Sequence, residues 1–471
     1  MSLTQLQQQA ATTTVPEDVP DLEPVRVVEL ELGQPLPAIL SYDDKSGRYY
    51  RHAKCLVRLH SHPLGVIDVQ LDGAGGQPQQ YTQHIWHMLH LQINEHLRLD
   101  GLPPVTGLYA AGLSCPSIPP CITQRERFLA DAPFVSVVMP THERLDTLPL
   151  SLHSLLTLHY PHYEVIVVDN APSTNSTADF IRLHYGDDPR VRYVREERKG
   201  VSWARNSGIA VARGTIVAFT DDDVMVDTHW LTELVRAFAI GDDVACVTGL
   251  VLPLELETSA QIWFEQYGGF SKGMTLRVFD THQFHPKTPL HPYTTGQFGT
   301  GASMAFQASF LHSIGGFDPA LGGEGPARCG QDIAAFFQVM RKGFRLVYVP
   351  SSLLYHTHRR DYTGLRKQIY NYGVGATAYL MKCVLENPWL FFDLITRIPY
   401  GLYFILSRHS PKNRKKQMHY PEDLRKVELK GMLYGPLAYL RTRRALRHTT
   451  HSPTTVAVPS SVPIAKEHFI Q

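Results

Sequence analysis

The sequence predicts an α/β protein: a Rossmann-like, mainly parallel sheet flanked by helices, with a small strand-rich N-terminal α+β domain and a C-terminal helical segment. From Phe134 onward, apolar runs such as FVSVVMP, EVIVVDN and TIVAFTDDD alternate with segments of helical pattern. Buried runs that alternate with helices are typical of a parallel sheet, because helices then cover both of its faces. At 471 residues the chain is long enough for roughly two or three domains.

The composition is that of a globular protein without a dominant charge. Hydrophobic residues make up 43% of the chain, and 45 Lys and Arg residues nearly balance 44 Asp and Glu residues. No global field favours nucleic acid as a partner, so any function that depends on charge is expected to be local. The six cysteines are scattered without a CxxC pair, which indicates a reducing, cytosolic environment.

Changes of pattern along the chain predict the domain boundaries. We expect, in chain order, a disordered tail (1–23), a small α+β accessory domain (24–124), a linker (125–133), the α/β domain (134–380), a helical segment (381–447) and a disordered tail (448–471). The first tail has no basic start followed by an apolar stretch, so we do not expect a secretory signal. In the accessory domain, one predicted helix has an apolar residue at every fourth position: Ile85, Leu89, Ile93 and Leu97.

Four histidines lie near or along that predicted helix: His84, His87, His90 and His96. A metal site is one interpretation. We favour the other, a polar helix face, because a chain with 24 histidines clusters some of them by chance.

The segment 217–224 reads VAFTDDDV, a short apolar run that ends in Asp221, Asp222 and Asp223. Neighbouring carboxylates at a buried strand end repel each other and lose hydration, so a hard cation such as Mg²⁺ or Mn²⁺ would stabilise them. In open α/β sheets, ligands bind outside the carboxyl ends of the strands. The alternative is a solvated acidic turn, and the surrounding sequence decides between the two.

Polar clusters fall at the ends of successive predicted strands. They are PTHER (140–144), VDN (168–170), the basic turn and helix RKGVSWARN (198–206) and TDDD (220–223). No GxGxxG follows the first strand, which argues against dinucleotide oxidoreduction. In this order and spacing the clusters resemble the nucleotide-binding half of the family 2 glycosyltransferases, which have the GT-A type fold. The resemblance covers roughly residues 133–378, about half of the chain.

The resemblance implies roles for individual residues. Asp169 would bind the nucleobase, Arg205 and Lys199 the diphosphate, and Asp221 and Asp223 a divalent metal ion. Further nucleotide-binding positions would be Pro140, Thr141, Glu143, Arg144 and Asp222. Taken alone, Asp169 is better explained as a turn or N-cap residue, and Arg205 as a solvated helix charge. Glu143 departs from the family, where Asn is frequent, and this puts the details of the base-binding turn in doubt.

The second half of the α/β domain matches the family as well. GTGASMAF (299–306) precedes GGFDPALGGEGPARCGQD (315–332) and a predicted helix. Asp332, at the expected N-terminus of that helix, stands where relatives have the catalytic base; its alternative is a plain N-cap residue. Gln331 stands where the family often has Glu. His356 is favoured over His358 as a residue that completes the metal or diphosphate site.

The resemblance implies an inverting, metal-dependent transfer of a sugar from a UDP- or dTDP-linked donor to a hydroxyl acceptor. The acceptor would be a glycan, a polysaccharide or a lipid-linked precursor, and the cofactor Mg²⁺ or Mn²⁺. The alternative is a sugar-nucleotide-binding scaffold or sensor without catalysis. A sugar-phosphate nucleotidyltransferase is disfavoured, because PTHER is not the glycine-rich basic loop that such an enzyme needs.

An apolar segment at 389–406 precedes a run of basic residues: Arg408, Lys412, Arg414, Lys415 and Lys416. It contains Asp393, Arg397 and Pro399, a poor composition for a membrane-spanning helix. We expect an amphipathic segment at a membrane surface, at the inner face of the plasma membrane. The alternative, of equal weight, is a buried helix pair with a basic surface loop.

Overall fold

The computed structural model describes residues 21–449, except 45, 74, 116, 282–287, 415 and 417–419. The tails expected at 1–23 and 448–471 therefore lie almost entirely outside the described residues, as does Lys415.

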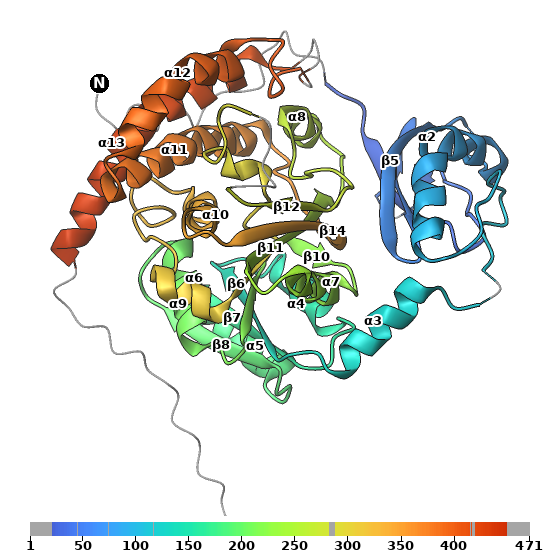
Figure 1. The fold of residues 1–471 in the computed structure, drawn as a ribbon, viewed down its shortest axis with the longest axis horizontal. Coiled ribbons are helices and arrows are strands. Elements are labelled where there is room, and N and C mark those ends of the chain that lie inside the picture. Colours follow the sequence, from blue (N-terminus) through green and yellow to red (C-terminus); the bar gives the residue numbers. More distant parts are fainter. Residues whose placement is uncertain are drawn as a thin grey trace, which may run out of the picture.

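A large mixed sheet forms the centre of the molecule, with the strand order β10-β14-β11-β13-β9-β6-β7-β8 and β12 paired with β14 (Figure 1). Its first half consists of β6 (Val135–Thr141), β7 (Tyr163–Asn170), β8 (Val191–Glu196) and β9 (Ile216–Phe219), with the helices α4 (Leu148–Leu156), α5 (Ser176–Tyr185) and α6 (Val201–Val211). All pairs among these strands are parallel. Strands β7 and β9 are buried along their whole length, as expected for strands covered on both faces.

The second half of the sheet adds antiparallel neighbours. Its elements are β10 (Val224–Val226), α7 (Trp230–Arg236), β11 (Val244–Pro253), α8 (Ser259–Tyr267), β12 (Arg277–Phe279), β13 (Met304–Gln307), α9 (Ala308–Ile314), α10 (Gln331–Arg341) and β14 (Arg345–His356). Strands β11 and β14 are parallel, whereas β13 runs antiparallel to both β9 and β11. The predicted α/β fold, with a mainly parallel sheet flanked by helices, is confirmed.

The register of the strands brings polar residues to one edge of the sheet. Thr141 at the end of β6 pairs with Asp169 of β7, and β9 ends beside β6, with Phe219 opposite Val138. Val224 of β10 pairs with His356 at the end of β14. The loop with the three aspartates therefore lies between the ends of strands from both halves of the sheet.

The N-terminal part forms a separate lobe beside the sheet (Figure 1). Strands β1 (Val25–Glu31), β4 (His52–Leu59) and β5 (His62–Gln70) pair in the order β1-β4-β5, and β2 (Tyr42–Asp43) pairs with β3 (Arg48–Tyr49). Helix α2 (Pro78–Leu99) buries the four apolar residues that the sequence analysis places on one face. This lobe has its own hydrophobic core, in which α2 packs on β4 and β5.

Helix α3 (Pro120–Ala130) occupies most of the segment 125–133 that the sequence predicts to be a linker. Proline at the first turn favours the start of this helix. Arg125 and Leu129 then bury one of its faces. The Arg125 Nε atom lies 2.9 Å from Glu233 Oε1 of α7, and both side chains are less than 10% exposed. The segment is thus an ordered contact between the lobe and the sheet, which a count of Pro and Gly does not reveal.

The C-terminal region consists of α11 (Tyr362–Glu386), α12 (Leu390–Leu406) and α13 (Glu422–Thr449). Helices α11 and α13 approach closely at glycines: a Cβ atom on Gly373 would lie 2.2 Å from the Glu428 carbonyl oxygen. Within the described residues, no helix is both long and apolar enough to cross a membrane.

The alternative of a buried helix pair does not hold for α12, which has no buried residue. The basic residues behind it are not all free either. Lys412 and Lys416 form ion pairs with Glu428 of α13, because the segment after α12 folds back onto that helix.

The buried Arg125–Glu233 pair gives a prediction about stability. Arg125→Met keeps the aliphatic stem but removes one of the two arginines that pair with Glu233. Breaking a buried ion pair leaves an under-compensated charge, so we expect the free energy of unfolding to fall by about 3 kcal/mol. Urea unfolding followed by tryptophan fluorescence measures the change. The control is Arg182→Met, which removes an exposed pair with Asp179 and should change little; equal effects of the two variants would contradict the prediction.

Candidate active site

A cavity of about 1360 Å³ opens at the carboxyl ends of β6, β7 and β9. It is lined by parts of α6, α10, α11 and α12 as well. Most of the residues that the sequence analysis singles out line it: Pro140, Thr141, Arg144, Lys199, Arg205, Asp221, Asp222, Asp223, Asp332 and His356. Glu143 and Asp169 do not.

Asp221, Asp223 and His356 form a group that fits a divalent metal ion. One ligand atom from each lies within 4.8 Å of the others, and His356 Nε2 is 3.2 Å from Asp223 Oδ1. The other ring nitrogen of His356, Nδ1, is buried without a hydrogen-bond partner. Burial lowers the pKa of His356 although Asp223 opposes this, and the neutral imidazole is the form that binds metals. Two carboxylates and one imidazole suit Mg²⁺ or Mn²⁺.

Two arginines compensate the three aspartates. Arg144 NH1 lies 2.8 Å from Asp223 Oδ2 and 3.4 Å from Asp222 Oδ1, and Arg205 NH2 lies 3.3 Å from Asp221 Oδ1. Burial acts to raise the pKa of Asp223, but His356 and Arg144 outweigh it and hold that pKa below its usual value. For Asp221, burial prevails and raises the pKa despite Arg205.

Asp222 differs from the other two aspartates in its pKa and in its contacts. Burial raises its pKa to about 7, and its Oδ2 atom accepts a hydrogen bond of 2.7 Å from the Thr141 hydroxyl. It is not part of the group of Asp221, Asp223 and His356 that could hold a metal ion. Asp222 therefore ties the aspartate loop to the end of β6.

Arg205 is buried in the cavity wall and has hydrogen-bond donors without a partner. It is 2% exposed, and its Nε and NH1 atoms have no partner. NH2 donates to the Gly301 carbonyl at 3.0 Å, in addition to its contact with Asp221. Unpaired guanidinium donors in a cavity wall fit phosphate oxygens, which they bind with charge-assisted hydrogen bonds.

Asp332 lies in the first turn of α10, after Gly330 with φ of 104°. Its Oδ2 atom accepts from the Gly301 amide at 3.0 Å and its Oδ1 atom from the Ile333 amide at 2.9 Å. Gly301 thus contacts both Arg205 and Asp332. A Cβ atom there would lie 3.1 Å from each of them, so the close approach depends on glycine. Gly301 belongs to the GTG sequence at 299–301, but the sequence analysis assigns no role to this glycine.

Asp169 is not among the residues that line the cavity. It is fully buried, its Oδ2 atom accepts from the Tyr193 hydroxyl at 2.9 Å, and Oδ1 has no partner. The next residue, Asn170, lines the cavity instead. Its side chain accepts from the Gly200 amide at 2.7 Å and donates to the Arg198 carbonyl at 2.8 Å.

Asn170 thereby orders the basic turn before α6. Gly200 has φ of 134°, and a Cβ atom on it would lie 2.4 Å from Gly323 Cα, so glycine is required. Lys199 is exposed and lines the cavity next to this turn. Glu143, with φ of 52°, is exposed and accepts from the Ser173 amide at 2.9 Å. The structure does not bring it into the cavity.

The other histidines that the sequence analysis considers differ in burial and in contacts. His358 Nε2 lies 2.9 Å from Glu265 Oε1 of α8, so its ring does not join the Asp221–Asp223–His356 group. His84, His87 and His90 are exposed on α2, in keeping with a polar face. His96 differs, because it is buried among residues from other segments.

Comparisons with known proteins show similarity to glycosyltransferases. Residues 136–311 match the family described as Glycosyl transferase family 2. The chain is 27% identical over 240 residues to the pre-mycofactocin glycosyltransferase of Mycobacterium tuberculosis, covering 50% of this chain and 46% of the relative. It is 25% identical over 194 residues to the glucosyl-dolichyl phosphate glucuronosyltransferase of Haloferax volcanii, covering 41% and 58%. With a putative teichuronic acid biosynthesis glycosyltransferase of Bacillus subtilis it shares 38% over 92 residues, covering 19% and 36%.

These matches span only part of each relative, from 36% to 58% of its length. Among solved structures, a mannosyltransferase of Pyrobaculum calidifontis in complex with GDP-Man and Mn²⁺ aligns with a TM-score of 0.41 and 18% identity, over 70% of this chain and 87% of that one. The family match covers the strands whose polar ends line the cavity. The segment of this chain that is similar to glycosyl transferase family 2, residues 136–311, thus lies within the α/β domain.

Proposed function

We propose that this chain is an inverting, metal-dependent glycosyltransferase that moves a sugar from a nucleoside-diphosphate sugar to a hydroxyl group. One observation carries the proposal. The metal-ligand group Asp221, Asp223 and His356 and the carboxylate of Asp332 line the same cavity, and Arg205 and Gly301 connect them. A leaving diphosphate and an attacking hydroxyl need these two features side by side.

In this proposal each group has one task. Asp221, Asp223 and His356 hold Mg²⁺ or Mn²⁺, which supplies positive charge for the departing diphosphate. Arg205, with its unpaired donors, binds phosphate oxygens, and Lys199 adds positive charge. Pro140, Thr141, Asn170 and Arg144 surround the nucleotide.

Asp332 accepts the proton of the acceptor hydroxyl as the oxygen attacks the anomeric carbon. The bond to the diphosphate breaks on the opposite face of the sugar, so the configuration inverts. Two other carboxylates that line the cavity support a single displacement, because each is engaged elsewhere. Asp361 caps α11 through the Gly364 amide, and Glu428 pairs with lysines, so neither is placed as a nucleophile.

For the donor we propose a UDP- or dTDP-linked sugar, and for the acceptor a glycan, a polysaccharide or a lipid-linked precursor. The names of two relatives, one referring to a dolichyl phosphate and one to teichuronic acid biosynthesis, support acceptors of this kind. The position of α12 supports a lipid-linked one. Leu394, Arg397, Gly401, Phe404 and Ile405 line the cavity, while large apolar side chains of the same helix are exposed.

The first test concerns the base. In Asp332→Asn the acceptor proton has no carboxylate to go to, so we expect turnover to fall by about 100-fold or more with nucleotide affinity retained. The measurement is donor hydrolysis or transfer over a panel of nucleotide sugars with Mn²⁺ or Mg²⁺. Glu324→Gln, which also alters a carboxylate lining the cavity, is the matched control and should stay active. Full activity of Asp332→Asn would refute the role of Asp332, and binding of donors without any turnover by the parent chain would favour a scaffold or sensor.

The second test concerns the metal. Asp223→Asn removes one charged ligand of the proposed ion, and we expect Mn²⁺ affinity to fall by more than about 100-fold. Mutation of residues that contact only the ligands lowers metal affinity less, by about 10- to 100-fold. Titration calorimetry with Mn²⁺ and a nucleoside diphosphate measures it. Asp222→Asn should bind Mn²⁺ within about tenfold of the parent, because Asp222 faces Thr141 instead. The proposal fails if the two variants lose affinity equally.

The third test concerns α12 and a membrane. Phe391, Phe392 and Ile395 expose between 45% and 62% of their surface, which fits insertion into a lipid interface. Phe392→Asp should reduce co-flotation of the chain with vesicles that contain anionic lipid. Leu91→Asp, at a leucine of α2 that is 70% exposed, serves as control. If the parent chain does not float, or if both variants float equally well, the membrane contact is wrong.

A further inference from the structure

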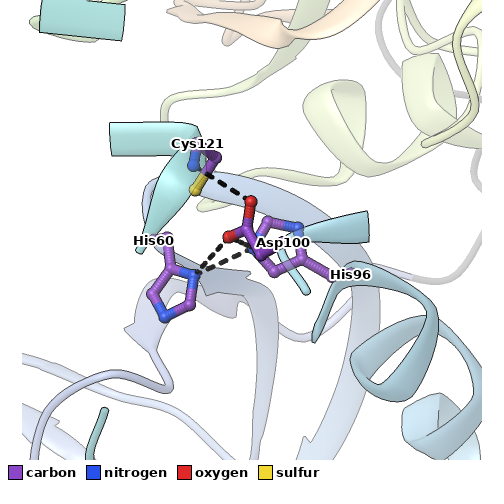
Figure 2. Close-up of side chains that lie close together, drawn as sticks. All are labelled: His60, His96, Asp100 and Cys121. Atoms are coloured by element: carbon purple, nitrogen blue, oxygen red, sulfur yellow. Dashed lines mark hydrogen bonds and ion pairs between the residues drawn. The ribbon is translucent and has the colours of Figure 1, made fainter. Parts of the chain in front are cut away.

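Four side chains from distant parts of the sequence meet between the N-terminal lobe and α3: His60, His96, Asp100 and Cys121 (Figure 2). His60 lies in the turn between β4 and β5, His96 is in the last turn of α2, Asp100 follows that helix, and Cys121 is in the first turn of α3. One ligand atom from each lies within 4.8 Å of all the others. The group is separate from the cavity of the transferase domain, none of whose lining residues belongs to it.

The distances among His60, His96 and Asp100 are close to those between ligands of one metal ion. His60 Nδ1 is 3.0 Å from His96 Nε2 and 3.3 Å from Asp100 Oδ2, and the last two atoms are 3.6 Å apart. Ligands around a tetrahedral Zn²⁺ ion, with bonds of about 2.0–2.3 Å, lie roughly 3.3–3.8 Å from one another. His60, His96 and Asp100 are at most 9% exposed, so the point they surround is shielded from water.

Neighbouring contacts orient the ligands as is usual around bound metals. The Cys121 amide donates to Asp100 Oδ1 at 3.0 Å, which leaves Oδ2 turned toward the two imidazoles. The second nitrogen of His60, Nε2, is 3.3 Å from Cys115 Sγ and so has its own partner. Contacts of this kind fix the tautomer of a histidine ligand and the direction of a carboxylate.

The charges also balance. A divalent ion with one thiolate, one carboxylate and two neutral imidazoles makes a site of zero net charge. Sulfur and nitrogen ligands select Zn²⁺ over Mg²⁺.

We propose that His60, His96, Asp100 and Cys121 bind a structural Zn²⁺ ion that fastens α3 to the N-terminal lobe. On binding, the Cys121 thiol releases its proton to solvent as the sulfur–zinc bond forms, and His60 Nδ1, His96 Nε2 and Asp100 Oδ2 complete a closed set of four ligands. Helix α3 also carries Arg125, which pairs with Glu233 of the transferase domain. The ion thus stabilises the junction of the two domains, and its presence is independent of the proposed transfer reaction.

The test uses the full chain with Asp221→Asn and Asp223→Asn, so that the proposed catalytic metal does not interfere. Elemental analysis after purification with added Zn²⁺ should find about one zinc per chain, as for a closed four-ligand site. His96→Gln in this background should weaken Zn²⁺ binding by more than about 100-fold, and His90→Gln, an exposed histidine of the same helix, should not. Failure of the parent to retain or titrate with Zn²⁺ would mean that the group is only a hydrogen-bonded network, and the proposal would be wrong.

Cobalt gives a readout that does not depend on the stability of the variants. Co²⁺ added to the metal-free chain should produce the visible bands of a tetrahedral ion and a thiolate-to-metal charge-transfer band in the near ultraviolet. Cys121→Ser should abolish the charge-transfer band, while Cys115→Ser should keep it. Absence of the band in the parent, or its loss in Cys115→Ser alone, would overturn the assigned ligand set.

Discussion

The rest of the candidate site depends on the need to neutralise three consecutive carboxylates at a buried strand end. Asp221, Asp222 and Asp223 follow β9, all four residues of which are buried. Their compensation comes from three separate elements: Arg144 after β6, Arg205 on α6 and His356 at the end of β14. Since isolated buried charges are costly, the folded loop depends on partners from both halves of the sheet. The same electrostatic demand that holds the site together makes it a place for a cation.

Arg205 links the two chemical ends of the cavity. Its NH2 atom contacts both Asp221 and the Gly301 carbonyl, and the Gly301 amide holds Asp332. The aspartate loop and α10 are thereby positioned relative to each other by one guanidinium and one peptide unit. Glycine at 301 permits this approach, since a side chain would press on both partners. An arrangement of this kind keeps the proposed base at a fixed distance from the proposed diphosphate site.

The sequence predicts what is local and misses what depends on side-chain direction or on distant contacts. The alternation of apolar runs and helices, and the polar residues that follow each run, are enough to predict the sheet and most of the cavity lining. They do not distinguish Asp169 from Asn170, because successive residues of β7 face opposite sides of the sheet and the contact of Asp169 with Tyr193 lies on a neighbouring strand. They favour His356 over His358 only by resemblance. The group of His60, His96, Asp100 and Cys121 cannot be predicted from the sequence, because His60 and Cys121 lie on other elements and have no regular spacing from His96.

Two buried arginines make the N-terminal lobe part of the transferase fold and not a tethered module. Arg58 of β4 lies 2.7 Å from Asp227, which directly follows β10, and Arg125 reaches Glu233 of α7. The Asp227 amide in turn donates to the Leu353 carbonyl of β14 at 3.0 Å. Strands β10 and β14 bracket the aspartate loop and carry His356. Because a buried charge without its partner costs several kcal/mol, displacement of the lobe would disturb the strand pair on which the metal-ligand group rests. The accessory lobe therefore contributes to the geometry of the site although none of its residues lines the cavity.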